Sequence, residues 1–370
     1  MNAAPRDDRI ELTLALHEGR VASVGISARR PLGIGRLAEG RDGDAVAALV
    51  PQLFALCAQA QGAAIFTALA AARGDVIAPD RAAAQTGAVL AERLVELLRG
   101  TITSLAGPSL PCFVPALRQV IDASRRFDGV ALPAVDAVAA IEAGLEALGL
   151  SAGCFDDDES YQRWLALSSP LAELHRPLVV DDSEFGAVAL DPLAADDDAL
   201  IGTALQRSGP HFASLPDLDG RLPETGALAR NADHPLIAAL GNGLGARLLA
   251  RLIEIRATPA LLRALLRGEA MPIDPISSRQ IAPGIGLAAV ECARGRLHHL
   301  VALDRQGLVS QFAILAPTEW NFHPRGPLFR ALQNLALRDD DADRARVARL
   351  VAAFDPCVAF SVTIAEAADA

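Results

Sequence analysis

Residues 286–315 read GLAAVECARGRLHHLVALDRQGLVSQFAIL, and this stretch decides the fold class. Three strand-like runs follow one another in it, Gly286–Cys292, Arg296–Leu303 and Leu308–Leu315. The last two are joined by Asp304-Arg305-Gln306-Gly307, a sequence typical of a turn. The pattern therefore predicts an antiparallel meander near the C-terminal end of the chain.

A second β pattern opens the chain. Polar and apolar side chains alternate over Ile10–Leu16 and again over Val21–Ser27, on either side of a turn at His17–Arg20, which predicts a β-hairpin. His175–Leu190 alternates like a pair of strands. Helical patterns dominate the rest of the chain. They cover Ala45–Arg73 with an interruption near Pro51, Arg81–Leu98, Ala134–Leu148, Ser160–Leu167, Pro235–Arg256, Pro259–Arg267, Pro327–Ala336 and Ala342–Ala353.

We therefore expect a single α+β domain over residues 1–370 that is predominantly helical, with an N-terminal β-hairpin and a C-terminal antiparallel meander. A chain of 370 residues, 51% of them apolar, can bury a large core. The segment Ser208–Glu224 is rich in Pro, Gly, Ser and Asp, so it predicts a loop. This loop is the one candidate for an internal boundary.

Composition excludes several classes of function. The net charge is -11 and no Lys/Arg-rich run occurs, which disfavours nucleic acids and anionic membranes as partners. The five cysteines form no CxxC pair and the first residues lack an apolar signal-peptide core, so we expect free thiols in a reducing cytoplasm. Ala45–Arg73 approaches the length of a membrane span, but Pro51 and three glutamines favour a buried helix.

Four short motifs follow one another along the chain. They are Glu39-Gly40-Arg41-Asp42 with Cys57 fifteen residues after Asp42, Glu291-Cys292-Ala293-Arg294-Gly295-Arg296-Leu297-His298-His299, Pro317-Thr318-Glu319-Trp320-Asn321, and Phe354-Asp355-Pro356-Cys357. In these motifs the chain resembles the [NiFe]-hydrogenase large subunit, whose patterns are E-G-R-D before R-x-C-G-x-C-x-x-x-H, E-A-P-R-G-x-L-x-H, P-T-x-W-N-x-S-P-R and D-P-C-x-x-C-x-x-H. Four collinear matches form a specific signal, although the stretch from about 98 to 282 matches nothing in the family pattern. The resemblance implies a truncated large-subunit-like fold.

The chain departs from the family at the metal ligands. Two CxxC pairs supply four soft thiolates to nickel and iron in the family. Here Phe54 and Phe360 stand at two of the four cysteine positions, so a four-thiolate nickel site cannot be built. Gln61 and Thr363 stand in place of the histidines of the two motifs, and Gly35 stands where the family has a glutamate ligand of a nearby magnesium site. The resemblance therefore implies a protein without nickel and without hydrogenase activity, which is not an enzyme.

Two cysteines keep family positions, and the resemblance implies that they are the metal ligands. Cys57 stands at a bridging position and Cys357 at a terminal one. Two thiolates together with diatomic ligands suit a low-spin iron, so the expected cofactor is an Fe(CN)2(CO) fragment, held transiently. Cys112, Cys154 and Cys292 are expected to be bystanders, although Cys292 is expected to lie close to the pocket.

The resemblance also implies a cofactor-binding set around the iron fragment. Arg294 would direct its guanidinium at a cyanide ligand, because a fixed fork of N–H donors suits a bound anion. Thr318 would donate a second hydrogen bond, and Pro317 and His299 complete the expected set. The residues alone leave two alternatives open: Arg294 is then an ion-paired arginine between strands, and His299 a structural histidine.

Three hypotheses of different classes follow. The first is a non-catalytic assembly scaffold of the HupK/HoxV type, which receives the Fe(CN)2(CO) unit from maturation chaperones of the HypC/HypD type and passes it toward the hydrogenase large-subunit precursor. The second is a metal-free interaction protein that docks on hydrogenase subunits or chaperones, with both motif cysteines as core residues. The third, a hydrogenase or a quinone-reducing enzyme like the related subunit of respiratory complex I, is disfavoured because nickel ligands are missing.

Overall fold

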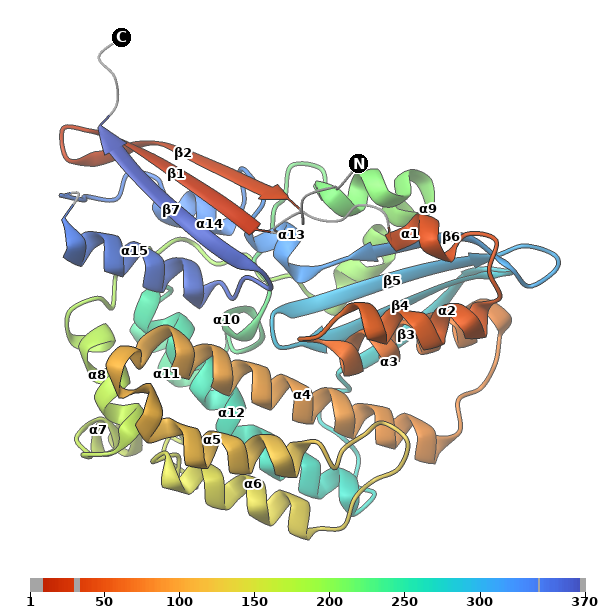
Figure 1. Cartoon of the computed structure of the whole chain (residues 1–370), viewed down its shortest axis with the longest axis horizontal. Coiled ribbons are helices and arrows are strands. Elements are labelled where there is room, and N and C mark those ends of the chain that lie inside the picture. Colours follow the sequence, from red (N-terminus) through yellow and green to blue (C-terminus); the bar gives the residue numbers. More distant parts are fainter. Residues whose placement is uncertain (1–8, 30–33, 339, 367–370) are drawn as a thin grey trace, which may run out of the picture.

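The computed structural model describes residues 9–29, 34–338 and 340–366, and Figure 1 shows two β-sheets above a layer of long helices. In the larger sheet the strands follow the order β3 (Ile276–Ala282), β4 (Ile285–Cys292), β5 (Gly295–Leu303) and β6 (Val309–Leu315), all antiparallel. The predicted meander is confirmed. Strand β3 extends it by one strand that the sequence did not indicate.

The smaller sheet joins the two ends of the chain. Its strand order is β2 (Arg20–Arg29), β1 (Arg9–His17) and β7 (Ala359–Glu366), with β1 antiparallel to β2 and parallel to β7. The predicted N-terminal hairpin is confirmed, whereas the pairing with β7 was not predicted. Apolar side chains of β1 point inward and are buried, in keeping with the period of two. As a result, the segment just before β7 is held close to the centre of the molecule.

Each face of the larger sheet is covered by a helix. Helix α3 (Ala58–Arg73) packs on one face, where its apolar side chains meet Ala288 and Val301. Helix α9 (Asp198–Ser214) packs on the other face and meets Leu287 and Leu300. Neighbouring residues of a strand point to opposite faces, so β4 and β5 are buried on both sides.

The long helices form a second layer beneath this sheet (Figure 1). Helices α4 (Pro79–Leu105), α5 (Leu110–Ser124), α6 (Asp136–Ala147) and α12 (Leu244–Leu266) share one large hydrophobic cluster. The other helical elements are α1 (Ile34–Ala38), α2 (Gly43–Leu49), η1 (Val50–Leu53), η2 (Gly107–Ser109), α7 (Asp158–Leu165), α8 (Pro170–Val180), η3 (Ala195–Asp197), α10 (Ala227–Arg230), α11 (Pro235–Leu240), α13 (Pro317–Asn321), α14 (Pro327–Leu332) and α15 (Asp341–Ala353).

Two predictions for the middle of the chain were wrong. His175–Leu190 is not a strand pair, because its first part belongs to helix α8 and no strand follows. The buried residues of α8 include Leu171, His175 and Leu178, spaced four and three apart, and this helical period is hidden by the local alternation. Ser208–Glu224 is not a loop throughout, because α9 continues to Ser214 across a kink at Gly209.

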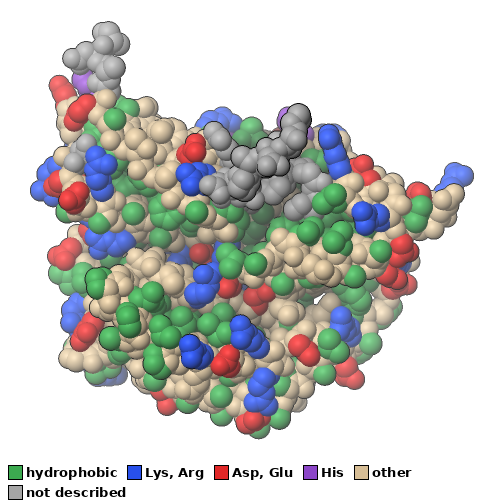
Figure 2. All heavy atoms as spheres, viewed as in Figure 1, with side chains coloured by type: hydrophobic (Ala, Val, Ile, Leu, Met, Phe, Trp, Pro, Cys, Tyr) green, Lys and Arg blue, Asp and Glu red, His purple; other side chains and the backbone are tan. Residues whose placement is uncertain are grey.

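Most predicted helices are confirmed, with shifted ends. The pattern at Pro235–Arg256 is divided into α11 and α12 by Gly241-Asn242-Gly243, and Pro259 lies inside α12 without ending it. Ala45–Arg73 forms α2, η1 and α3, with Pro51 at the predicted interruption. None of the described helices combines the length and the apolarity that crossing a membrane requires. Acidic and basic side chains are interspersed on the face shown in Figure 2 rather than gathered by sign.

Candidate functional site

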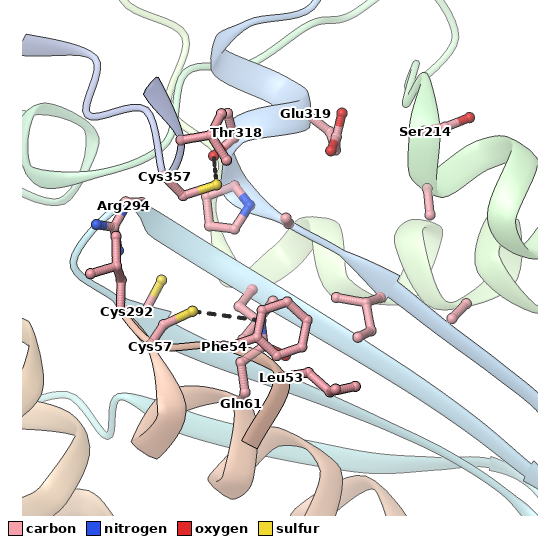
Figure 3. A pocket seen from close by; sticks show the side chains of 18 of the residues that line it. Leu53, Phe54, Cys57, Gln61, Ser214, Cys292, Arg294, Thr318, Glu319 and Cys357 are labelled. Carbon is pink, nitrogen blue, oxygen red and sulfur yellow. Dashed lines mark hydrogen bonds between the residues drawn. The ribbon is translucent and has the colours of Figure 1, made fainter. Parts of the chain in front are cut away.

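A pocket of about 350 Å³ lies where the start of α3, the end of the β4–β5 hairpin, α13 and the segment before β7 meet. Most of its lining side chains are apolar, and Phe54 and Phe312 are the largest. Figure 3 shows three thiols turned toward this space. Six residues supply thiol, amide, hydroxyl or guanidinium groups at its inner end: Cys57, Gln61, Cys292, Arg294, Thr318 and Cys357.

Cys57 enters the pocket from the start of α3. It is the N-cap residue of that helix, and the extended backbone at Phe54 separates it from η1. Gln61 lies one turn further along α3, and its Nε2 donates to the Cys57 sulfur over 3.8 Å. The Oε1 atom of Gln61 lies 2.7 Å from Nε2 of His299 on β5. Because an amide oxygen only accepts, this ring nitrogen carries the proton, and the three side chains form one chain of hydrogen bonds.

Cys357 reaches the pocket from the opposite end of the sequence. Helix α15 ends at Ala353, where Asp355 adopts a left-handed conformation with φ of 55° and Pro356 prevents further helix. The Thr318 hydroxyl on α13 donates to the Cys357 sulfur over 3.6 Å. Cys357 then leads into β7, so the parallel pairing with β1 fixes the direction in which the chain leaves the pocket.

Arg294 occupies the tight turn between β4 and β5. The turn needs glycine at position 295, where φ is 130° and a Cβ atom would meet Thr225 Oγ1 at 2.3 Å. The Arg294 side chain is buried and its Nη2 donates to Glu96 on α4 over 3.1 Å. Its Nε and Nη1 groups have no hydrogen-bond partner. Buried donors without partners are costly, so this guanidinium suits an anionic ligand.

Burial dominates the ionisation of the thiols. It raises the pKa of Cys57 far above its ordinary value, and the neighbouring thiol of Cys292 acts in the same direction. Burial raises the pKa of Cys292 to about 11, although the Arg294 guanidinium opposes the shift. Both are therefore neutral thiols at pH 7, and a metal that binds to them must displace a proton.

The carboxylate of Glu92 lies next to the first residues of α3. Glu92 on α4 accepts hydrogen bonds from the backbone N–H groups of Gln59 and Ala60, over 2.7 and 3.0 Å. It thereby caps the start of α3. Burial raises the pKa of Glu92 to about 7 against these two hydrogen bonds, which lower it. The start of α3 is therefore held to α4 by a group that is close to its midpoint of titration at neutral pH.

Charges on the other face of the sheet are fully paired. Arg296 on β5 donates to both carboxylate oxygens of Asp198 on α9, over 2.7 and 2.5 Å, and to Glu291 over 2.8 Å. His298 contacts the same Asp198 at 2.9 Å. Arg296, His298 and Glu254, an acceptor of Arg230, are all buried. This network holds the β4–β5 hairpin, and with it Arg294, in a fixed position.

The structure brings most predicted site residues together. Cys57, Cys357, Arg294, Thr318 and Pro317 all line the pocket. The other predicted residue, His299, is buried behind Gln61 and does not line it.

The remaining cysteines divide into one that belongs to the pocket and two that do not. Cys292 was expected to be a bystander close to the pocket, and it is part of the lining. Cys112 is exposed on α5, and Cys154 is buried in the helical layer. The thiols of Cys57, Cys112, Cys154 and Cys292 are free. Cys112 therefore provides an internal reference for the reactivity of the thiols in the pocket.

Sequence reasoning missed two carboxylates near the pocket. Glu92 and Glu96 lie one helical turn apart on α4, among many buried residues of that helix. This spacing on a buried face is the signal by which they are recognisable, because buried glutamates usually have partners. Glu96 binds Arg294 and also pairs with Arg99 at 2.6 Å.

The donor set fits a metal fragment better than a bare ion. Across residues 9–29, 34–338 and 340–366, no three His, Cys, Asp or Glu side chains are arranged so that they could hold a metal ion by themselves. A fragment that carries its own diatomic ligands needs fewer protein ligands, and thiolates are the soft donors that suit low-spin iron. The two free N–H groups of Arg294 fit the negative charge of bound cyanide.

Comparison with known proteins identifies relatives along almost the whole chain. The chain is 36% identical to the hydrogenase expression/formation protein HupK of Bradyrhizobium diazoefficiens, and the alignment covers 98% of each chain. It is 34% identical to HupK of Rhizobium leguminosarum bv. viciae, again over 98% of each chain. It is 33% identical to the hydrogenase expression/formation protein HoxV of Cupriavidus necator, over 92% of this chain and 93% of that protein.

Solved structures and a family model agree on the fold. The nickel-dependent hydrogenase family model matches residues 250–363. The Ni-Fe-Se hydrogenase from Desulfovibrio vulgaris Hildenborough superposes with a TM-score of 0.63 over 93% of this chain and 94% of that chain, at 17% identity. The [NiFeSe]-hydrogenase of Desulfomicrobium baculatum gives a TM-score of 0.61 over 93% and 95% of the two chains, also at 17% identity. The hydrogenase large-subunit-like fold that the motifs implied is confirmed.

Proposed function

The chain belongs to the family of HupK and HoxV hydrogenase expression/formation proteins, and from that premise we propose that it is a non-catalytic carrier of the Fe(CN)2(CO) fragment. Family membership supports a role in hydrogenase maturation. The carrier receives the fragment from chaperones of the HypC/HypD type and passes it toward the hydrogenase large-subunit precursor. Nickel has no part in this function, because two of the four family cysteines are replaced by Phe54 and Phe360.

One observation carries the proposal. The same pocket is lined by Cys57, Cys357 and Arg294, a buried guanidinium with two N–H groups that lack partners. The two thiolates would hold the iron after loss of their protons, and the guanidinium would bind a cyanide ligand. Thr318 supports this role, because its hydroxyl donates to the Cys357 sulfur. The apolar lining excludes water from a fragment that carries carbon monoxide.

The test is infrared spectroscopy of the protein purified without oxygen from a host that contains the maturation proteins. We expect bands of metal-bound cyanide and carbonyl, together with iron close to one atom per chain. The double variant Cys57→Ser, Cys357→Ser should lack both the bands and the iron. The matched control is Cys112→Ser, which removes an exposed thiol outside the pocket and should leave both unchanged.

Two outcomes would contradict the proposal. One is the absence of both bands from the wild-type protein, and the other is their persistence in the double variant. The alternative is a metal-free interaction protein that docks on hydrogenase subunits or maturation chaperones. Under that alternative, the double serine variant would support hydrogenase maturation in the cell as well as the wild type does.

A further inference from the structure

A second and much smaller cavity lies on the far side of Arg294. Its volume is about 20 Å³, and Arg294 lines both this cavity and the pocket. Arg251 of α12 and Asp355, which follows α15, line the cavity as well. Arg294 thus lines both spaces, whereas Asp355, two positions before Cys357, lines the smaller one.

Several buried polar atoms around this cavity have no hydrogen-bond partner. Arg251 has an exposed fraction of 2% and Arg294 of 5%, yet Nη1 of Arg251 and both Nε and Nη1 of Arg294 have no hydrogen-bond partner. Oδ2 of Asp355 is also buried without a partner. The direct contact between Arg251 Nη2 and Asp355 Oδ1 is 3.8 Å, too long for a hydrogen bond. Arg251 and Asp355 thus form an ion pair without a direct hydrogen bond, and each keeps one buried polar atom without a partner.

The remaining hydrogen bonds of Arg251 lead to the same segment of chain. Its Nη2 donates to the backbone carbonyls of Ala352 and Ala353 over 2.7 and 2.9 Å. These carbonyls belong to the last turn of α15, and the one of Ala352 also accepts the backbone N–H of Asp355 over 3.0 Å. Arg251 therefore contacts three points of the chain just before Cys357: two carbonyls directly and one carboxylate at a longer distance.

We propose that the cavity binds one water molecule that joins Asp355 to Arg251, and that Arg251 is thereby the positioning residue for Cys357. A buried water needs a volume of roughly 10–15 Å³ and two to four polar partners, and the cavity offers both. Arg251 supplies a donor and Asp355 an acceptor, while Arg294 offers a third contact. The water completes the bonds that fix the turn at Asp355-Pro356, and this turn sets where the Cys357 sulfur lies relative to the Thr318 hydroxyl. The inference concerns the metal-free protein and does not depend on iron transport.

The first test is a high-resolution crystal structure of the metal-free protein. We expect a density peak within hydrogen-bond distance of Arg251 Nη1 and Asp355 Oδ2, with the occupancy of an ordered water. An empty cavity, or a cavity filled by a shifted guanidinium, would overturn the water site.

The second test measures the alkylation rate of Cys357 relative to that of Cys112 in the same molecule, by mass spectrometry of the metal-free protein. Arg251→Met should raise this ratio about tenfold, because a local opening equilibrium shifts when charge-assisted hydrogen bonds are lost. Arg251→Lys keeps the charge and one donor, so its ratio should lie between those of the wild type and Arg251→Met. It replaces Arg251→Met in the experiment if that variant does not fold. Asp355→Asn should raise the ratio less than Arg251→Met, because an amide still binds the water.

The matched control is Arg93→Lys. Arg93 is another buried arginine of the helical layer with an unpartnered Nε, and its charged neighbours are Glu254 and Arg230 rather than Asp355. If Arg251 only stabilises the core in general, Arg93→Lys and Arg251→Lys will change the ratio equally, and the positioning role is then refuted. An unchanged ratio in folded Arg251→Met would refute it as well.

Discussion

Two buried arginines of the β4–β5 hairpin, Arg296 on β5 and Arg294 in the turn, differ in how completely they are hydrogen-bonded. On the α9 face, Arg296 and His298 are both bound to Asp198, and no N–H group of Arg296 lacks a partner. In the turn of the same hairpin, Arg294 has one hydrogen-bond partner, Glu96 on α4, and two N–H groups without any. Both arginines are about 95% buried, so solvent does not explain the difference.

This difference separates an arginine that stabilises the hairpin from an arginine whose N–H groups remain available to a ligand. A buried arginine with all its donors paired fixes the hairpin, and it is costly only when its partner is removed. A buried arginine with donors left over is costly in the free protein and recovers that cost when an anion binds. Of these two arginines, the one with incomplete hydrogen bonds is the one that lines the pocket.

The largest effect is expected from Arg296→Met. This change leaves the carboxylates of Asp198 and Glu291 buried and only partly paired, so we expect a loss of about 3–5 kcal/mol in the free energy of unfolding. Urea unfolding followed by circular dichroism measures it. A loss below about 1 kcal/mol would show that the network on the α9 face is not what holds the hairpin.

Arg294→Met is expected to have a small effect on stability and a large effect on iron binding. Glu96 keeps its ion pair with Arg99, so the free energy of unfolding should fall by only about 1 kcal/mol. Retention of iron should fall roughly 10- to 100-fold, because a hydrogen bond to a charged ligand contributes about 1.5–3 kcal/mol. The iron-to-protein ratio and the intensity of the cyanide bands after gel filtration measure the loss. Iron retention equal to that of the wild type would remove Arg294 from the site.

The sequence predicted the parts of this arrangement that depend on local signals. The turn at Asp304–Gly307 and the alternation on either side of it were sufficient for the meander, and the resemblance of short motifs was sufficient for Cys57, Cys357 and Arg294. Strand β7 was missed because its partner β1 lies at the other end of the chain, and an eight-residue run does not indicate what it pairs with.

The partners of the two arginines could not be predicted for the same reason. Glu96 is 198 residues from Arg294, and Asp198 is 98 residues from Arg296. Which carboxylate meets which guanidinium depends on how α4 and α9 pack against the hairpin, and neither composition nor periodicity contains that information. Only the three-dimensional structure therefore shows that two N–H groups of Arg294 have no partner.

The buried side chain of His299 makes the stability of the fold depend on pH. Burial lowers the pKa of His299 to about 3, from an ordinary value of 6.5. Because the folded state keeps this ring neutral while the unfolded state takes up a proton, stability is full above pH 6.5 and falls as the pH decreases toward 3. Between pH 6.5 and 5 the loss amounts to about 2 kcal/mol for one histidine.

His299→Gln should remove that share of the pH dependence. Unfolding free energies measured at pH 7, 6 and 5 should fall less steeply in the variant than in the wild type. His175, which is buried with a pKa lowered to about 3, remains in the variant and accounts for a residual slope. Equal slopes in both proteins would show that His299 is protonated in the folded state, and the hydrogen-bond direction inferred for Gln61 would then need revision.

The smallest effect is expected from Gln61→Leu, which interrupts the hydrogen bonds between His299 and Cys57. The amide reaches the Cys57 sulfur over 3.8 Å, so its removal should cost only about 1 kcal/mol in stability. In the iron-loaded protein the thiolate loses a donor and gives more electron density to the metal, so the carbonyl band should move to lower frequency. Gln52→Leu, on the exposed surface of η1, is the matched control and should leave the band in place. A carbonyl band that does not move in Gln61→Leu would mean that Cys57 is not a ligand of the iron, even if Arg294 binds a cyanide.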